Sequence, residues 1–189
     1  MRRAAAPPPT HRHPTPLTAA HPPNYRHQAD VAHAYQLLRR GGVPANRIIT
    51  FAFNDIAWSR ENKYFPGQIF NAPGGDDVYA GFVHDYSGRA VNAEAFLAVL
   101  SGNASSPAVT RTWHSSGRVV EAGPADRLFL YYSDHGAPGL LGMPSGDFLY
   151  ADQLHAALKR RARRGGFREA VVYVSSAASL SCQSKQKTS

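Results

Sequence analysis

The chain is short of cysteine, of acidic residues and of long apolar runs. Cys182 is the only cysteine among 189 residues, which excludes an internal disulfide and any metal site built from several cysteines. No apolar run approaches the roughly 18 residues that a membrane-spanning helix requires. Thirteen acidic residues stand against 21 lysines and arginines, so the formal net charge is +8 and an anionic partner such as nucleic acid has to be considered.

The first 23 residues hold seven of the 14 prolines and no acidic residue. Missing backbone donors and low hydrophobicity keep such a segment from packing, so residues 1–23 are predicted to be disordered. The segment lacks the continuous apolar core of a secretory signal, while its Arg and Thr content fits either a transit peptide or a plain Ala/Pro-rich tail. The sequence therefore predicts neither export nor a membrane span.

Helical and strand patterns alternate along the rest of the chain. Helices are predicted over 26–42, 92–103 and 150–164, and strands over 46–53, 127–133 and 169–176. Near-continuous apolar strands require a sheet that is covered on both faces. The sequence therefore predicts an α/β fold with three layers, α/β/α, and a mostly parallel sheet. The irregular stretch 54–90 is longer than a connection needs, so it is either functional or loosely ordered.

The densest basic cluster is "KRRARR" (159–164), at the end of the third predicted helix. Leu154 and Leu158 precede it at helical spacing, so the arginines are predicted to form a solvated outer face, with a nucleic-acid patch as the alternative. No RNP-type aromatic motif, set of zinc ligands or Gly-rich phosphate loop accompanies the cluster. Nucleic-acid binding is therefore the less favoured hypothesis, and no metal or cofactor is predicted.

The stretch "LFLYYSDHG" (128–136) is an apolar strand that ends on polar residues. In an open parallel sheet, ligands gather at the carboxyl ends of the strands, where His135 would lie. Histidine titrates near neutral pH, so His135 is a candidate general base; the alternative is a histidine that caps the strand and bonds a nearby carbonyl. Gly136 would let the chain turn sharply and leave room for a substrate. A cysteine at the end of the strand 169–176 would complete a Cys/His dyad, but the residues there are "VSSAASLSC".

Four blocks of the sequence, in the same order and spacing, resemble the legumain family of cysteine endopeptidases. They are "NYRHQADVAHAYQLLRRGGVP" (24–44), "NDIAWSREN" (54–62), "GGDDVYAGFVHDYSGRAVNAEAFLAVLSGN" (74–103) and "GPADRLFLYYSDHGAPGLLGMP" (123–144). Over about residues 24–174 the chain is most similar to the plant type, also called asparaginyl endopeptidases or vacuolar processing enzymes. The resemblance implies a caspase-like α/β fold, here incomplete, and cleavage of peptides or proteins after Asn and, at lower pH, after Asp.

The resemblance also implies roles for particular residues. His135 would be the catalytic base, Asn24 would orient it, and the backbone of Gly136 would donate to the oxyanion. Arg26 would lie in the pocket for the substrate Asn, with His27 beside it, because a guanidinium can bond the oxygen of a carboxamide. No metal is implied, and the compartment implied by the family is vacuolar or lysosomal.

The chain departs from the family at the end of the last predicted strand. Where the family has Glu-Ala-Cys-Glu-Ser-Gly, this chain has residues 175–180, "SSAASL", so Ala177 takes the place of the nucleophile and Ser175 that of a pocket glutamate. Alanine has no group that can attack a carbonyl. Cys182 comes five residues later, which is more than ~10 Å away along an extended chain.

The family's first strand is also replaced, here by "HPTPLTAAHPP", whose prolines do not suit a central strand. The sequence therefore predicts a disordered segment (1–23), a partial legumain-like peptidase domain (24–176) and an aberrant polar tail (177–189). By family the function is that of a cysteine endopeptidase, inactive in this chain because of Ala177. The alternative is a non-catalytic pseudopeptidase or peptide-binding fragment. A decayed relative, an incomplete sequence of an active enzyme and mis-joined coding sequence all fit these departures.

Overall fold

The computed structural model describes residues 24–176, so the predictions for 1–23 and 177–189 lie outside the described residues. The helices are α1 (Tyr25–Arg40), α2 (Ala93–Ser101) and α3 (Ala151–Arg163), with 3-10 turns η2 (Ala45–Arg47), η3 (Gly88–Ala90) and η4 (Pro107–Val109). The strands are β1 (Arg127–Asp134), β2 (Gly136–Ala137), β3 (Leu140–Leu141), β4 (Leu149–Tyr150) and β5 (Glu169–Ser176). Within residues 24–176, no helix is both long and apolar enough to cross a bilayer.

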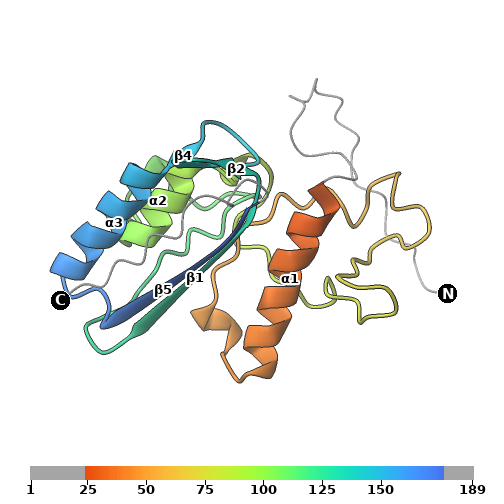
Figure 1. The fold of residues 1–189 in the computed structure, drawn as a ribbon, viewed down its shortest axis with the longest axis horizontal. Helices are drawn as coiled ribbons and strands as arrows, with labels where there is room; N and C mark the ends of the chain where they lie inside the picture. The colour runs from red at the N-terminus through yellow and green to blue at the C-terminus, as the bar shows by residue number, and fades with distance from the viewer. Residues whose placement is uncertain (1–23, 177–189) are drawn as a thin grey trace.

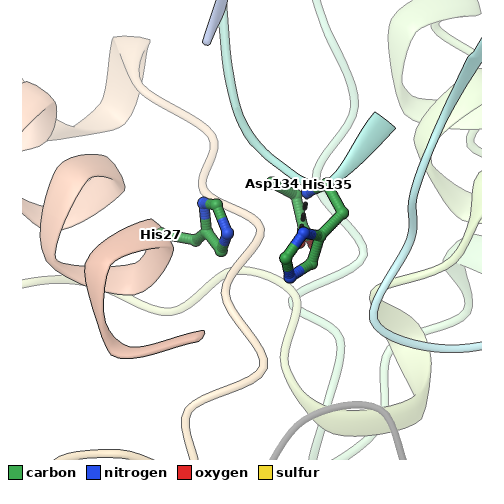
Figure 2. Close-up of side chains that lie close together, drawn as sticks. All are labelled: His27, Asp134 and His135. Carbon is green, nitrogen blue, oxygen red and sulfur yellow. Dashed lines mark hydrogen bonds between the residues drawn. The ribbon is translucent and has the colours of Figure 1, made fainter. Parts of the chain in front are cut away.

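Strands β1 and β5 pair in parallel over their whole lengths, from Arg127 opposite Glu169 to Asp134 opposite Ser176. Helix α1 lies on one side of this pair and α2 and α3 lie on the other, which gives three layers (Figure 1). The predicted α/β fold with a parallel sheet is thus confirmed, as are the strands 127–133 and 169–176. The carboxyl end of β1 leads directly to His135 (Figure 2).

The three predicted helices form where their start and stop residues indicate. Helix α1 ends just before Gly41. Helix α2 starts after Asn92, whose side-chain oxygen accepts a hydrogen bond from the backbone N–H of Ala95 at 2.8 Å. Gly102 ends this helix in a left-handed conformation, φ 71°, which only glycine adopts without a steric cost.

The strand predicted over 46–53 is wrong. Its first residues lie in η2, and of residues 46–53 only Phe51 forms a bridge, in parallel with Tyr86. The β-branched and aromatic composition favours an extended chain, but a strand also requires a neighbour to complete its ladder. A cavity of about 1160 Å³ lies between residues 48–53 and β1, and no strand of residues 24–176 occupies it. For the same reason, within residues 24–176 β1 is paired with a strand on one edge only.

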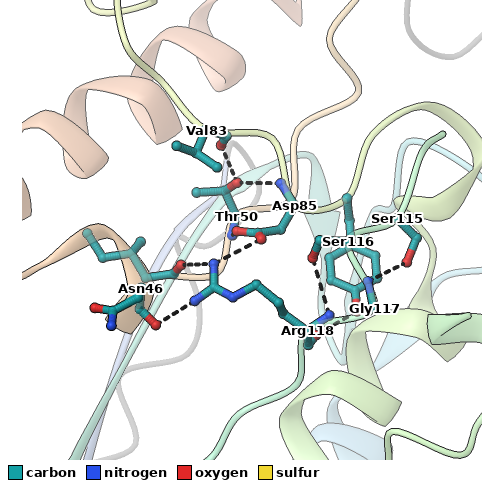
Figure 3. A network of polar contacts seen from close by, with 10 residues as sticks. Asn46, Thr50, Val83, Asp85, Ser115, Ser116, Gly117 and Arg118 are labelled. Carbon is teal, nitrogen blue, oxygen red and sulfur yellow. Dashed lines mark hydrogen bonds and ion pairs between the residues drawn. The ribbon is translucent and has the colours of Figure 1, made fainter. Parts of the chain in front are cut away.

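A buried ion pair holds the 46–53 segment in place of a ladder (Figure 3). The Asp85 side chain is only 3% exposed, and its two oxygens accept from the Thr50 N–H at 3.1 Å and from the Arg118 guanidinium at 2.9 Å. Arg118 also donates to the backbone carbonyls of Ile48, at 3.0 Å, and Asn46. These bonds satisfy backbone groups that a neighbouring strand would otherwise satisfy.

The long stretch 54–90 has little regular structure, yet it is packed. Ile56, Ile69, Val78 and Phe82 are buried in one cluster with residues of α1 such as Tyr35. The ring of Phe82 meets that of Tyr35 edge-on, with centroids 5.3 Å apart. Apolar burial, rather than backbone ladders, therefore orders this stretch.

The arginines of helix α3 were predicted to face solvent, and this prediction is wrong for Arg161. Arg161 is only 8% exposed, and its guanidinium donates to the carbonyls of Leu100 at 3.1 Å, Val120 at 3.0 Å, Ala122 at 3.1 Å and Gly166 at 3.3 Å. Burial lowers the pKa of Arg161. The Leu100 carbonyl belongs to the last turn of α2, where a positive charge is favourable. Arg161 therefore joins α3 to α2 and to the 120–122 loop.

We expect Arg161→Met to lower the free energy of unfolding by about 2–4 kcal/mol, because it leaves several buried carbonyls without donors. Urea denaturation followed by circular dichroism measures this change. Arg160→Met is the matched control, because Arg160 is the exposed neighbour on the same helix and should change stability by less than about 0.5 kcal/mol. Equal effects of the two substitutions would contradict the structural role of Arg161.

The one-sided pairing of β1 predicts an alternating pattern of amide exchange. Successive N–H groups of a strand point to opposite edges, so every second amide of β1 is bonded to β5 and the others face the cavity. In hydrogen–deuterium exchange followed by NMR, the cavity-facing amides should exchange at least about tenfold faster than their neighbours. Uniform protection along residues 128–134 would show that both edges are paired.

Candidate functional site

The candidate site lies where the carboxyl end of β1 meets the amino end of α1. His135, exposed just beyond β1, and Asn24, the residue before α1, are brought together by the packing of α1 on β1. The Nε2 atom of His135 lies 2.9 Å from Oδ1 of Asn24. A carboxamide oxygen only accepts hydrogen bonds, so Nε2 carries the proton and the neutral ring keeps its lone pair on Nδ1.

His27, in the first turn of α1, is 7% exposed and is held by a chain of hydrogen bonds. The hydroxyl of Ser133 donates to Asp30 at 3.0 Å, so its oxygen accepts the longer, 3.4 Å bond from Nδ1–H of His27. The lone pair of His27 therefore lies on Nε2, which is buried and has no hydrogen-bond partner among the described residues. Burial lowers the pKa of His27, which favours the neutral ring.

Asp134 stands next to both histidines. Its carboxylate accepts the backbone N–H of His135 at 2.7 Å, and burial raises its pKa. One nitrogen of His27, one nitrogen of His135 and one oxygen of Asp134 all lie within 4.8 Å of one another (Figure 2). Strand alternation would place Asp134 and His135 on opposite faces, but β1 ends at Asp134 and the chain turns there, so both side chains reach the same place.

Hydrogen bonds hold the turn that follows His135. The hydroxyl of Tyr132 lies 2.9 Å from the carbonyl oxygen of His135 and 2.5 Å from that of Gly142. The N–H of Gly142 donates to the same His135 carbonyl at 2.7 Å. The backbone at His135 is therefore held from two directions, which limits the positions that its ring can take.

Gly136 begins the short strand β2, which pairs with β3. A Cβ atom at Gly136 would come within 2.4 Å of the Ser176 hydroxyl and 3.1 Å of the Leu140 carbonyl oxygen, so the absence of a side chain favours this close approach to the end of β5. The bond from Gly142 N–H to the His135 carbonyl makes Gly136 and Leu141 a non-hydrogen-bonded pair. The N–H of Gly136 is therefore not used by β3.

The structure brings only some of the predicted site residues together. Asn24, His27, His135 and Gly136 meet at one rim of the sheet. Arg26 is exposed on the first turn of α1, and Ser175 is the register partner of Ser133, so its side chain lies on the sheet face that α1 covers. Within residues 24–176, no hydrogen bond or ion pair joins Arg26 to Ser175. Ala177 lies outside the described residues.

Three residues of the site were not predicted from the sequence: Asp30, Ser133 and Asp134. Ser133 and Asp134 belong to the quoted strand-end motif, but their partners lie on α1, which sequence spacing does not reveal. A signal existed for Asp30, which lies three residues after His27 and therefore on the same face of the helix.

Comparison with known proteins identifies relatives of this chain. The model of the Peptidase C13 family matches residues 19–188. A vacuolar-processing enzyme of Vicia sativa is 51% identical over 147 residues, which cover 78% of this chain and 29% of that protein. A vacuolar-processing enzyme of Citrus sinensis is 48% identical, with coverages of 78% and 28%, and a legumain of Canavalia ensiformis is 46% identical, with coverages of 78% and 30%.

The chain thus spans less than a third of the length of the curated relatives that it matches. The family model nevertheless covers most of the chain, and the matching part is close to half identical to these relatives. The resemblance that four sequence blocks indicated is confirmed, and the chain belongs to the Peptidase C13 family.

Proposed function

We propose that this chain carries the base half of a legumain-like cysteine endopeptidase site, with His135 as the base and Asn24 as the residue that orients it. The observation that carries this proposal is the 2.9 Å hydrogen bond between Asn24 Oδ1 and His135 Nε2 at the carboxyl end of β1. It leaves Nδ1 of His135 as the atom that accepts a proton from an attacking thiol. The names of the relatives support a role in protein processing in the vacuole.

In the proposed reaction, a thiol gives its proton to His135 and the thiolate attacks the carbonyl carbon of a peptide bond. The N–H of Gly136, which β3 leaves unused, would donate to the oxyanion of the tetrahedral intermediate. His135 would then give the proton to the leaving amine, and water would hydrolyse the acyl-enzyme. The first step requires the Nε2–H of His135 to donate to Asn24, so that Nδ1 is free to accept the thiol proton. The ring is then an imidazolium until it gives that proton to the leaving amine.

The substrate side chain is proposed to bind beside the first turn of α1. The guanidinium of Arg26, exposed at the rim, would bond the side-chain oxygen of a substrate Asn or Asp, with His27 beneath it. Ser175 stands where the family has a glutamate, so the amide nitrogen of Asn would lack a charged acceptor. A chain with this pocket and no nucleophile would act as a peptide-binding pseudopeptidase, which is the second candidate function.

The nucleophile is the missing part of the proposed site. Strands β1 and β5 are paired as far as Asp134 and Ser176, and the next residue in the sequence, at the position of the family's cysteine, is Ala177. We therefore propose that this chain alone does not hydrolyse peptide bonds.

We expect no turnover of an Ala-Ala-Asn fluorogenic peptide above the buffer rate, because Ala177 has no group that can form the acyl-enzyme and Cys182 stands five residues after the family's nucleophile position. The same result is expected for Cys182→Ala. Turnover by the unmodified chain that Cys182→Ala abolishes would identify Cys182 as the nucleophile and overturn this account.

A gain-of-thiol variant tests the position of His135 directly. In a Cys182→Ala background, the thiol introduced by Ala177→Cys should react with iodoacetamide near pH 6 at least about tenfold faster than a free cysteine, because a neighbouring imidazole lowers a thiol pKa. Adding His135→Ala should remove the acceleration, and His155→Ala, which changes an exposed histidine of α3, should keep it. Equal reaction rates with and without His135 would contradict the proposed dyad.

A further inference from the structure

Three potential metal ligands converge where α1 meets β1. They are His27 and His135, whose ring centroids lie 4.8 Å apart in an edge-on arrangement, and Asp134 beside them. We propose that these three residues form a binding site for one divalent transition-metal ion, with Zn²⁺ as the ion that fits the ligand set best. The proposal rests on the geometry of the cluster and does not require the proposed peptidase reaction.

The hydrogen bonds around the two histidines leave a lone pair on each ring. Nδ1–H of His27 donates to Ser133, and Ser133 in turn donates to Asp30. Nε2–H of His135 donates to Asn24. Histidines that bind metals usually donate their other N–H to an oxygen, which sets the tautomer and the orientation of the ring. Both histidines of the cluster already have this second contact.

The unpartnered nitrogen of His27 is the observation that points most directly to a ligand. Nε2 of His27 is buried, in a side chain that is more than nine tenths buried, and it has no partner among the described residues. A buried polar atom without a partner costs free energy, so such atoms are rare in folded proteins. A metal ion bound by Nε2 would satisfy this atom.

To bind Zn²⁺, the three ligand atoms need to move only slightly closer together. Zn–N bonds of about 2.0–2.1 Å place two ligand atoms of a tetrahedral site about 3.3 Å apart. The ligand atoms lie within 4.8 Å of one another without an ion, so they must approach by about 1.5 Å or less. The backbone of His135 is held in place, but its exposed side chain can make this movement by rotating about its own bonds. Its exposure also lets a water molecule take the fourth position.

Two His nitrogens and one carboxylate oxygen suit Zn²⁺ rather than Ca²⁺ or Mg²⁺, which prefer all-oxygen sites. Burial keeps His27 neutral and raises the pKa of Asp134, and a bound cation would favour the ionised carboxylate. Asp30 adds a negative charge nearby, whereas the exposed guanidinium of Arg26 opposes a cation. A metal bound through Nδ1 of His135 would occupy the lone pair that a general base needs, so Zn²⁺ would block that role.

The test is calorimetric titration of the full chain with zinc chloride, in a Cys182→Ser background that removes the thiol. We expect one site per chain, and we expect His27→Ala and Asp134→Asn each to weaken Zn²⁺ binding at least about tenfold. Ser133→Ala, which removes only the acceptor of His27 Nδ1–H, should weaken binding by about 10–100-fold while circular dichroism shows an unchanged fold.

Two control variants separate this site from other histidines. His33→Ala changes a histidine one and a half turns along α1, and His11→Ala/His13→Ala removes a His-x-His pair near the amino terminus. Neither should change the affinity of the site. Binding that is lost in His11→Ala/His13→Ala, or that is unchanged in both Ser133→Ala and Asp134→Asn, would overturn the proposal. Because Ser133→Ala and Asp134→Asn alter no ring, they remain informative if His27→Ala does not fold.

Discussion

The parallel pairing of β1 with β5 is the interaction on which the rest of the structure depends. It runs in one register over eight residues of each strand, and α1 packs against β1 on one face of the pair. This packing sets Asn24 within hydrogen-bonding distance of His135 and His27 next to Asp134. The site therefore forms where two segments far apart in the sequence meet. A change in the packing of α1 on β1 would change the distances between the site residues. The Tyr132 hydroxyl and the Gly142 N–H supply a second restraint at the turn.

The opposite edge of β1 has no strand beside it within the described range 24–176. A cavity of about 1160 Å³ separates it from residues 48–53, and the Asp85–Arg118 pair holds that segment from its other side. A central strand of a parallel α/β sheet is normally bonded on both edges, so half of the polar backbone of β1 faces this cavity.

Local sequence patterns predicted the helices and strands whose formation depends mainly on neighbouring residues in the chain. Helical periodicity with Asn92 and Gly102 at its ends placed α2, and the apolar runs of β1 and β5 placed the two strands. The prediction of a strand at 46–53 was wrong because a strand needs a hydrogen-bonded neighbour. The β propensity of a segment does not show whether such a neighbour is present. Arg161 was assigned to solvent because its partners, the carbonyls of Leu100, Val120 and Ala122, come from other parts of the chain. His135 could be found from its place after a strand, and Asn24 only from the family resemblance. The cluster of His27, Asp134 and His135 required the structure, since strand alternation argued against it.

The packing of α1 on β1 fixes opposite tautomers of two neighbouring neutral rings, with the proton of His135 on Nε2 and that of His27 on Nδ1. Multiple-bond ¹H–¹⁵N NMR spectra of the metal-free chain near pH 8 distinguish the two tautomers of each neutral imidazole directly. The account predicts an Nε2–H signal pattern for His135 and an Nδ1–H pattern for His27. An Nδ1–H pattern for His135, or averaged signals for both rings, would contradict it.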